Sequence, residues 1–199
     1  GPRSFTWRKD APGGIYWIEA QDGGDPRSKV DIRDKLFYLE AQIKNKAKSG
    51  PALKYRFGGI EWGNGKVAMV YDWWWKTRKE RTLLFQPDFP DKISQVIFDR
   101  SWENRYNDPG NFVTKPNQYG RYILLIEGRN KTLYLTGRGA SPQGNRPFID
   151  RFFLKTKRTI RLWRSKAPYY ESVSDLINIK KHLVLTRREG KTIQPNYFI

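Results

Sequence analysis

The chain has 199 residues, with 38 Lys and Arg against 20 Asp and Glu, and its formal net charge is +18. A field of this sign attracts nucleic acid, anionic surfaces or acidic peptides without selecting among them. The chain has no cysteine and one histidine, His182, which excludes disulfides, a thiolate nucleophile and a site built from several imidazoles. We therefore expect no cofactor and no metal.

Aromatic residues make up 15% of the chain, including eight Trp, which indicates a folded protein rather than a disordered one. No run of 18 apolar residues occurs, and no targeting segment is recognisable, so we expect no membrane partner and predict no localisation.

Short apolar strands separated by turns are predicted along the whole chain, whereas helical periodicity is scarce. In chain order the expected strands cover residues 15–18, 36–39, 55–62, 67–73, 81–85, 95–98, 122–126, 132–135, 149–154 and 183–185. Clusters of Gly, Pro and Asp lie between them, as in Asp108-Pro109-Gly110. This pattern is typical of an antiparallel all-β protein.

Four of these strands follow a turn and are apolar on both faces, as expected for strands pressed between neighbouring sheets. They begin at Ile15, Val67, Tyr122 and Leu183, which are 52, 55 and 61 residues apart. Propeller blades repeat every ~40–50 residues before insertions. The predicted fold is a partial β-propeller of about three four-stranded antiparallel blades plus the start of a fourth, with a β-sandwich as the alternative. The expected blades are residues 1–52, 53–108, 109–168 and a partial blade at 169–199.

The sequence stops within an apolar segment at Tyr197-Phe198-Ile199, so we expect a fragment of a longer protein. A partial propeller exposes strand edges, and such edges predict self-association.

Four ordered motifs along the chain resemble those of one family. They are 16–20 with Gly23-Gly24-Asp25-Pro26-Arg27, Phe98-Asp99-Arg100 running to Arg105-Tyr106-Asn107-Asp108-Pro109-Gly110, Gly139-Ala140-Ser141-Pro142 running to Pro147-Phe148-Ile149-Asp150-Arg151, and Leu185-Thr186-Arg187-Arg188-Glu189 with Pro195-Asn196-Tyr197-Phe198. Together they resemble the N-terminal β-propeller of prolyl oligopeptidase-family serine peptidases, in the glutamyl endopeptidase-like branch. Asn145 and Gly190 depart from the family pattern.

The resemblance implies that catalysis belongs to a C-terminal α/β-hydrolase domain, which this chain lacks. It also implies that the propeller gates access and orients peptide substrates, together with that missing domain. The chain alone is then non-catalytic.

Four arginines are the candidate substrate-binding residues. Arg100 precedes a polar loop that contains Arg105, and these arginines either contact acidic peptide side chains or join neighbouring blades. Arg187 and Arg188 lie at the end of a strand on opposite faces. We therefore expect one of them to pair with Glu189 or a neighbouring blade, and the other to reach the central tunnel of the propeller.

Two other segments have alternative interpretations. Gly139–Gln143 lacks the last glycine of a nucleophile elbow, and no helix pattern follows it, so we interpret it as a loop. Residues 72–79 interleave three Trp with cations, as single-strand nucleic-acid binders do, but we favour tryptophans packed between blades. The alternative functions are therefore a basic nucleic-acid-binding module and a stand-alone propeller scaffold for protein partners.

Overall fold

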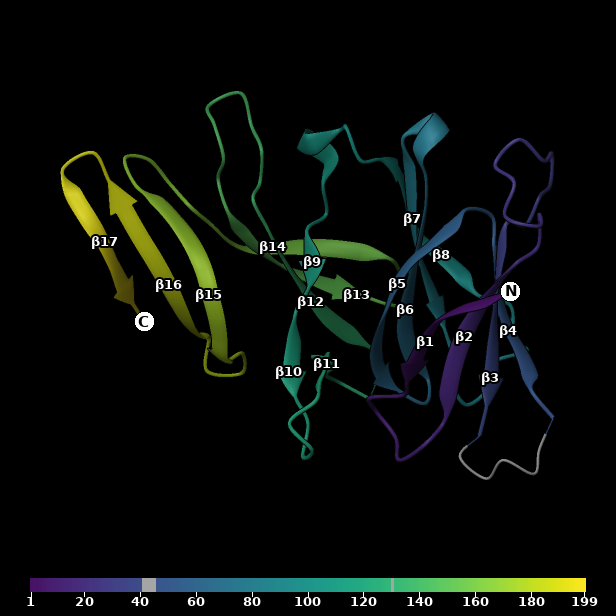
Figure 1. Ribbon diagram of the computed structural model, residues 1–199. Helices are drawn as coiled ribbons and strands as arrows, with labels where there is room; N and C mark the ends of the chain where they lie inside the picture. The colour runs from purple at the N-terminus through teal and green to yellow at the C-terminus, as the bar shows by residue number, and fades with distance from the viewer. Residues whose placement is uncertain (41–45, 130) are drawn as a thin grey trace. The chain divides into compact units, whose positions relative to one another are not determined.

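The computed structural model describes residues 1–40, 46–129 and 131–199, and β-strands joined by turns dominate this part of the chain (Figure 1). The chain divides into two compact units. Unit 1 contains residues 1–103 and 114–124, and unit 2 contains residues 104–113 and 125–199.

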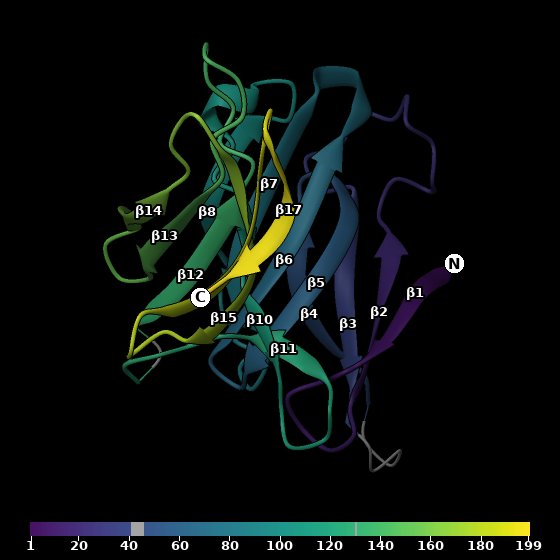
Figure 2. The ribbon, with the colours of Figure 1, turned by 90° about the vertical axis from the view of Figure 1, so that its left-hand side faces the viewer.

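Sheet 1 of unit 1 contains four antiparallel strands in sequential order, of which Figure 2 shows β1, β2 and β3 side by side. The strands are β1 Pro2–Trp7, β2 Ile15–Ala20, β3 Asp34–Leu39 and β4 Lys48–Leu53. Strand alternation buries Tyr16 and Ile18 on one face of β2. The turn before β2 requires glycine, because Gly14 has a φ of 90° and a Cβ there would lie 2.8 Å from the Tyr38 ring.

Sheet 2 of unit 1 also has four sequential antiparallel strands, as the sequence predicted for this stretch. They are β5 Arg56–Asn64, β6 Val67–Trp74, β7 Lys79–Phe85 and β8 Gln95–Ser101, and the 3₁₀ turn η1 Trp75–Thr77 joins β6 to β7. Residues 67–70 are buried without interruption, which confirms the prediction that β6 is apolar on both faces.

One predicted blade strand was wrong. Tyr122–Leu124 forms β11, which pairs with β10 Thr114–Pro116 in a separate two-stranded hairpin. The strand at the second position of the third four-stranded sheet is instead β12, which begins at Thr132. The corresponding strands β2, β6, β12 and β16 then start 52, 65 and 51 residues apart. The hairpin is an insertion between β6 and β12, and it explains why the second interval is long.

Aromatic rings form the core between sheets 1 and 2 in unit 1. The Tyr16 ring lies 4.6 Å from that of Tyr38 and 4.9 Å from that of Trp62, and Trp62 lies 6.1 Å from Phe85. Such ring pairs contribute about 0.5–1.5 kcal/mol each beyond the area they bury. The inserted hairpin adds Ile123 to the same core.

Buried ion pairs also join sheets 1 and 2. The carboxylates of Asp22 and Asp34 are fully buried. Arg56 of β5 donates to Asp22 at 2.7 Å and to Asp34 at 2.9 Å, and Arg33 donates to Asp22 at 2.8 Å. Burial alone would raise the pKa of Asp22, but the hydrogen bonds from Arg56, the Gly24 amide and Arg33 lower it overall. Each buried carboxylate is therefore matched by guanidinium groups.

Unit 2 contains two further antiparallel sheets. Sheet 3 has the order β14-β13-β12-β9, with β9 Asn111–Phe112, β12 Thr132–Gly137, β13 Phe148–Phe153 and β14 Arg158–Arg164. The 3₁₀ turn η2 Arg105–Asn107 precedes β9. Sheet 4 contains β15 Tyr170–Asn178, β16 Leu183–Gly190 and β17 Ile193–Phe198, which lie side by side in Figure 1.

The core of unit 2 between sheets 3 and 4 includes Tyr134, Ile149 and Leu176. The Tyr134 hydroxyl donates to Glu127 at 2.6 Å. Burial, aided by that carboxylate, raises the pKa of Tyr134 to about 12.

The predicted fold class is confirmed, since the residues that the structure describes form three four-stranded antiparallel sheets and a three-stranded fourth, besides the two-stranded hairpin. The blade limits at residues 52, 108 and 168 stay a prediction. No helix in the described residues is long and apolar enough to span a bilayer.

Candidate functional site

Sheet 4 places Arg188 beside a carboxylate. Glu171 of β15 lies directly opposite Arg188 of β16, and the Arg188 Nε donates to Glu171 at 3.0 Å. The Thr186 hydroxyl donates to the other oxygen of Glu171 at 2.5 Å. The guanidinium also lies 4.4 Å from the Phe198 ring and 5.3 Å from the Tyr169 ring. These contacts hold Arg188 in one orientation on the face of the sheet that it shares with Thr186.

An apolar pocket of about 380 Å³ adjoins this pair within unit 2. Arg188, Glu171 and Thr186 form one polar wall of the pocket, and Arg151 and His182 are its other polar lining residues. We call it the β16 pocket, and its other lining residues include Ile149, Leu162, Trp163, Ile179, Val184 and Phe198. Apolar walls with a few fixed polar groups are typical of ligand-binding cavities.

Arg187 lies on the opposite face of β16. It forms an ion pair of 2.9 Å with Glu189, two residues further along the same strand, and both side chains are more than a third exposed. It is not among the residues that line the β16 pocket. The alternation of a strand therefore separates Arg187 from Arg188, and only Arg188 reaches a cavity.

The structure does not bring the other two predicted arginines to this pocket. Arg100 belongs to unit 1, where it lies opposite Glu80 on the neighbouring strand and pairs with it at 2.6 Å. Its side chain is only 18% exposed. Arg105 belongs to unit 2, where it lies in the exposed η2 turn. Arg105 therefore presents its charge to solvent, whereas the charge of Arg100 is largely neutralised.

The tryptophans of residues 72–79 are more exposed than expected for side chains packed between blades. Trp73 and Trp75 are 42% and 65% exposed, and both contact the ring of Trp102. Arg78 lies 3.9 Å above the Trp75 ring. Only Trp74 fits the expected packing, because the Arg33 guanidinium of the preceding blade lies 3.8 Å above its ring.

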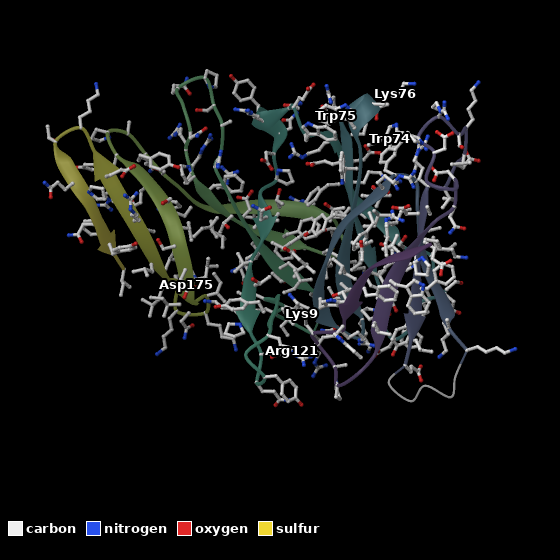
Figure 3. The ribbon with its side chains drawn as sticks, viewed as in Figure 1. Lys9, Trp74, Trp75, Lys76, Arg121 and Asp175 are labelled. Carbon is white, nitrogen blue, oxygen red and sulfur yellow. The ribbon has the colours of Figure 1, made fainter. Side chains whose placement is uncertain are left out.

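A basic surface groove lies beside Trp74 in unit 1. Trp74 and Lys76 form one wall, and the other wall is the loop of residues 26–33, which contributes Arg27, Lys29 and Arg33. Trp74, Trp75 and Lys76 lie together in Figure 3. We call this feature the Trp74 groove.

The inserted hairpin is tied to the opening of sheet 1. Asn117 donates to the Lys9 carbonyl at 2.8 Å, and Arg121 donates to the Arg8 carbonyl at 3.2 Å, which agrees with the proximity of Lys9 and Arg121 in Figure 3. Arg8 itself is buried between Asp10 and Asp88. Burial alone would lower the pKa of Arg8, but hydrogen bonds to these two carboxylates raise it, so this arginine is structural.

Ser141 and His182 do not form a nucleophile–base pair. Ser141 lies in a loop, and its hydroxyl donates to the Gly144 carbonyl at 2.7 Å. His182 is exposed in the turn between β15 and β16 and lines the β16 pocket, but Ser141 does not. Within the described residues no group of three or more His, Asp or Glu is placed to hold a metal ion.

Sequence reasoning missed Glu171 and Trp163 as parts of this site. An acidic residue in the strand before Arg187-Arg188 was the available signal, since arginines pair with carboxylates across strands. Which arginine it faces depends on register, and the β15–β16 pairing shifts register twice between Val173 and Asn178. Periodicity alone does not predict such shifts.

Comparison with known proteins supplies the family. A protein of Oryza sativa subsp. japonica described as "Probable glutamyl endopeptidase, chloroplastic" is 36% identical over 213 residues, covering 100% of this chain and 23% of that protein. A protein of Arabidopsis thaliana with the same description is 36% identical over 212 residues, covering 99% of this chain and 22% of that protein. The chain thus spans less than a quarter of the length of these curated relatives.

No family model matches the chain. Among solved structures, the β-propeller domain of the Trilobed protease from Pyrococcus furiosus aligns with a TM-score of 0.44 and 7% identity, covering 100% of this chain and 56% of that one. Because the two plant proteins match the chain from end to end, the resemblance to glutamyl endopeptidases found in the sequence is confirmed for this segment.

Proposed function

We propose that this chain is the propeller segment of a serine-type peptidase that cleaves acidic peptides, and that it gates and orients those peptides over a catalytic centre carried elsewhere in the protein. The observation that carries the proposal is the 36% identity to glutamyl endopeptidases along the whole chain. The all-β sheets of unit 1 and unit 2 are consistent with a lid of this kind.

The chemistry of the chain supports a non-catalytic role. A Ser-His-Asp triad needs a histidine within hydrogen-bond reach of the serine. The chain has only His182, which is exposed in a turn, and the Ser141 hydroxyl is bonded to a backbone carbonyl. We therefore assign the triad to a hydrolase domain outside this chain, which is also its proposed partner.

The charge of the chain supports the choice of substrate class. A net charge of +18 raises the local concentration of acidic peptides and their association rate, and salt screens this effect. Exposed cations such as Arg105 contribute to this field, whereas Arg100 contributes less because Glu80 neutralises it.

Steady-state kinetics of the full-length protein test this function. We expect hydrolysis of a peptide with a central Glu, a higher kcat/KM than for its Gln analogue, and a fall in that ratio as salt rises. Arg105→Glu should raise KM for the Glu peptide several-fold at low salt, whereas Lys155→Glu, the same charge change in an exposed turn, should not. Equal KM values for both variants would contradict a specific role of Arg105 in substrate binding. Absence of peptide hydrolysis would contradict the proposed peptidase function.

Gating has its own test. A lid that restricts entry admits short peptides and rejects folded proteins, so a folded protein rich in surface Glu should resist cleavage by the full-length protein until it is denatured. Equal cleavage of the native and denatured forms would contradict gating.

Single-stranded nucleic acid is the second candidate ligand of this chain, and the exposed Trp75 and the cations of the Trp74 groove favour it. Bases stack on exposed aromatic rings, and lysines and arginines contact phosphates. Labelled oligo-dT titrated at rising salt decides the matter, because binding through stacking should persist at physiological salt and should be lost in Trp75→Ala. Binding that vanishes with salt and ignores Trp75 indicates bulk charge attraction only.

Self-association through strand edges remains part of the proposal. Within the described residues β17 pairs only with β16, so its other edge is available to a further strand. Light scattering over a range of protein concentrations measures whether the full-length protein forms dimers.

A further inference from the structure

A β-bulge in sheet 3 gathers three arginines at one end of β14. The pairing of β13 with β14 shifts register between Ile149 and Asp150, so that Asp150 faces Arg161 while Ile149 faces Trp163. Leu162 is the extra residue of the bulge. A bulge interrupts strand alternation and re-aims the side chains around it, so residues three apart can share a face. Arg161 and Arg164 are such a pair, and the positive charge of each acts on the other.

The positive charge of this cluster exceeds its negative charge. Asp150 is bonded by Arg161, whose Nε and Nη2 both donate to its carboxylate. Arg146 donates its Nε to the Ser165 carbonyl at 3.2 Å, which satisfies a donor without neutralising its charge. The Arg164 Nε is buried and has no hydrogen-bond partner in the described structure. The cluster thus contains one carboxylate and three guanidinium groups.

The unmatched donor is costly to the fold. A buried donor without a partner destabilises the folded state, because it gives up hydrogen bonds to water and gains none in the protein. Burial is the largest influence on Arg164 and lowers its pKa, and the neighbouring charges of Arg146 and Arg161 lower it further. An anion bound beside the Arg164 guanidinium relieves the repulsion, because its negative charge offsets the like charges of Arg146 and Arg161.

An open groove gives an anion access to this cluster. We call it the arginine groove, and its lining includes Arg161, Trp163, Arg164, Lys166, Tyr169 and Arg188. Glu171 also lines it, but Thr186 and Arg188 already donate to that carboxylate. The groove shares Leu162, Trp163, Glu171 and Arg188 with the β16 pocket, so a cationic rim adjoins an apolar cavity.

We propose that the arginine groove is a carboxylate-binding subsite that holds a Glu or Asp side chain of a peptide, with Arg164 and Lys166 as its main ligands and the β16 pocket accepting an apolar neighbour of that residue. This inference rests on the proposed function, because it names the part of the chain that selects acidic peptides. A guanidinium group matches the geometry of a carboxylate in a bidentate pair. A nucleic-acid strand fits less well, because Glu171 lies in the same wall and would repel a continuous row of phosphates.

Binding measurements on the full-length protein, pretreated with a serine-directed fluorophosphonate so that peptides stay intact, test the subsite. The probes are a fluorescent peptide with a Glu next to a Leu, its Gln analogue, free phosphate as a competitor, and labelled oligo-dT. We expect the Glu peptide to bind about tenfold more tightly than the Gln analogue, as the loss of one or two charge-assisted hydrogen bonds predicts. Phosphate at millimolar concentration should compete only weakly.

Matched variants assign the preference to the groove. Arg164→Gln and Lys166→Gln should each bring the Glu-to-Gln affinity ratio close to one, and Lys166 is exposed, so its replacement leaves folding intact. Arg158→Gln, at the other end of β14, removes the same charge and should keep the tenfold ratio. An unchanged ratio in Lys166→Gln and in a folded Arg164→Gln overturns the proposal, as does oligo-dT binding that depends on Arg164 while peptide binding does not.

The subsite and the proposed function can fail separately. Selective binding of the Glu peptide without hydrolysis by the untreated protein supports the subsite and refutes the peptidase. Hydrolysis with a Glu preference that survives Arg164→Gln supports the peptidase and refutes the subsite.

Discussion

Both units use arginine–carboxylate contacts, but they balance the charges differently. In unit 1, Asp22 and Asp34 are fully buried. Arg56 donates to both of them across the two sheets, and Arg33 donates to Asp22 within the connection between β2 and β3 of sheet 1. In unit 2, Asp150 is one carboxylate among Arg146, Arg161 and Arg164, and the Arg164 Nε has no partner among the residues that the structure describes. Ion pairs whose charges balance indicate a structural contact between two sheets, which we call the joint. Cations without matching carboxylates beside a groove indicate a ligand-binding site.

Replacement of Arg56 should have the largest effect and would test the joint. Arg56→Met leaves Asp22 and Asp34 buried with fewer donors, and breaking a buried pair in this way costs about 3–5 kcal/mol. The free energy of unfolding, measured by urea titration with tryptophan fluorescence, should fall by that amount. Arg56→Lys keeps the charge but not the guanidinium that donates to two carboxylates. The free energy of unfolding of Arg56→Lys should therefore lie between those of Arg56→Met and wild type. A loss below about 1 kcal/mol in Arg56→Met would show that the joint is not held by these pairs.

Acid should weaken the same joint, with a smaller effect. The pKa of Asp22 is lowered in the folded protein, so its contribution to stability is present above the ordinary aspartate value of 3.8 and is lost as pH falls below it. The midpoint of thermal unfolding should therefore drop between about pH 4 and pH 2. In Asp22→Asn this part of the drop should be absent, and an identical pH profile in that variant would contradict the assignment.

Replacement of Arg164 should change the free energy of unfolding in the opposite direction to replacement of Arg56, so these two variants compare the two units directly. Arg164→Leu removes a buried donor without a partner and relieves repulsion from Arg146 and Arg161. We expect the free energy of unfolding to stay the same or to rise by up to about 1 kcal/mol. A loss of several kcal/mol would place Arg164 among the structural arginines.

The sequence predicted the parts of this comparison that depend on alternation. The sequence of residues 55–98 predicts four strands, because apolar residues and turns alternate there without interruption, and the structure has β5 to β8 in this stretch. Tyr122 was misplaced because the run from Tyr122 to Ile126 is as apolar as a blade strand, and nothing in its period marks an inserted hairpin. The fold class survived this error, since the remaining strands still form four sheets.

The candidate site was less accessible to sequence reasoning. Strand alternation places Arg187 and Arg188 on opposite faces of β16, and the sequence predicts this separation. The arginine groove depends on a bulge at Leu162 and on the register that brings Glu171 opposite Arg188. Both are consequences of strand pairing, which contacts distant in sequence determine, so Arg164 could not be singled out from the 38 cations of the chain.

The two arginines of β16 provide the smallest expected effect and the finest form of the comparison. Arg187 and Glu189 are both more than a third exposed, so Arg187→Gln should change the free energy of unfolding by about 0–1 kcal/mol. Arg188→Gln leaves Glu171, whose side chain is 13% exposed, with Thr186 as its remaining donor, so its cost should be larger, about 1–3 kcal/mol. Thermal and urea unfolding of the two variants side by side measures the difference. If both cost the same, the carboxylate of Glu171 is no more dependent on its arginine than a surface residue is, and the Arg188–Glu171 pair gives no support to the peptide orientation that we propose.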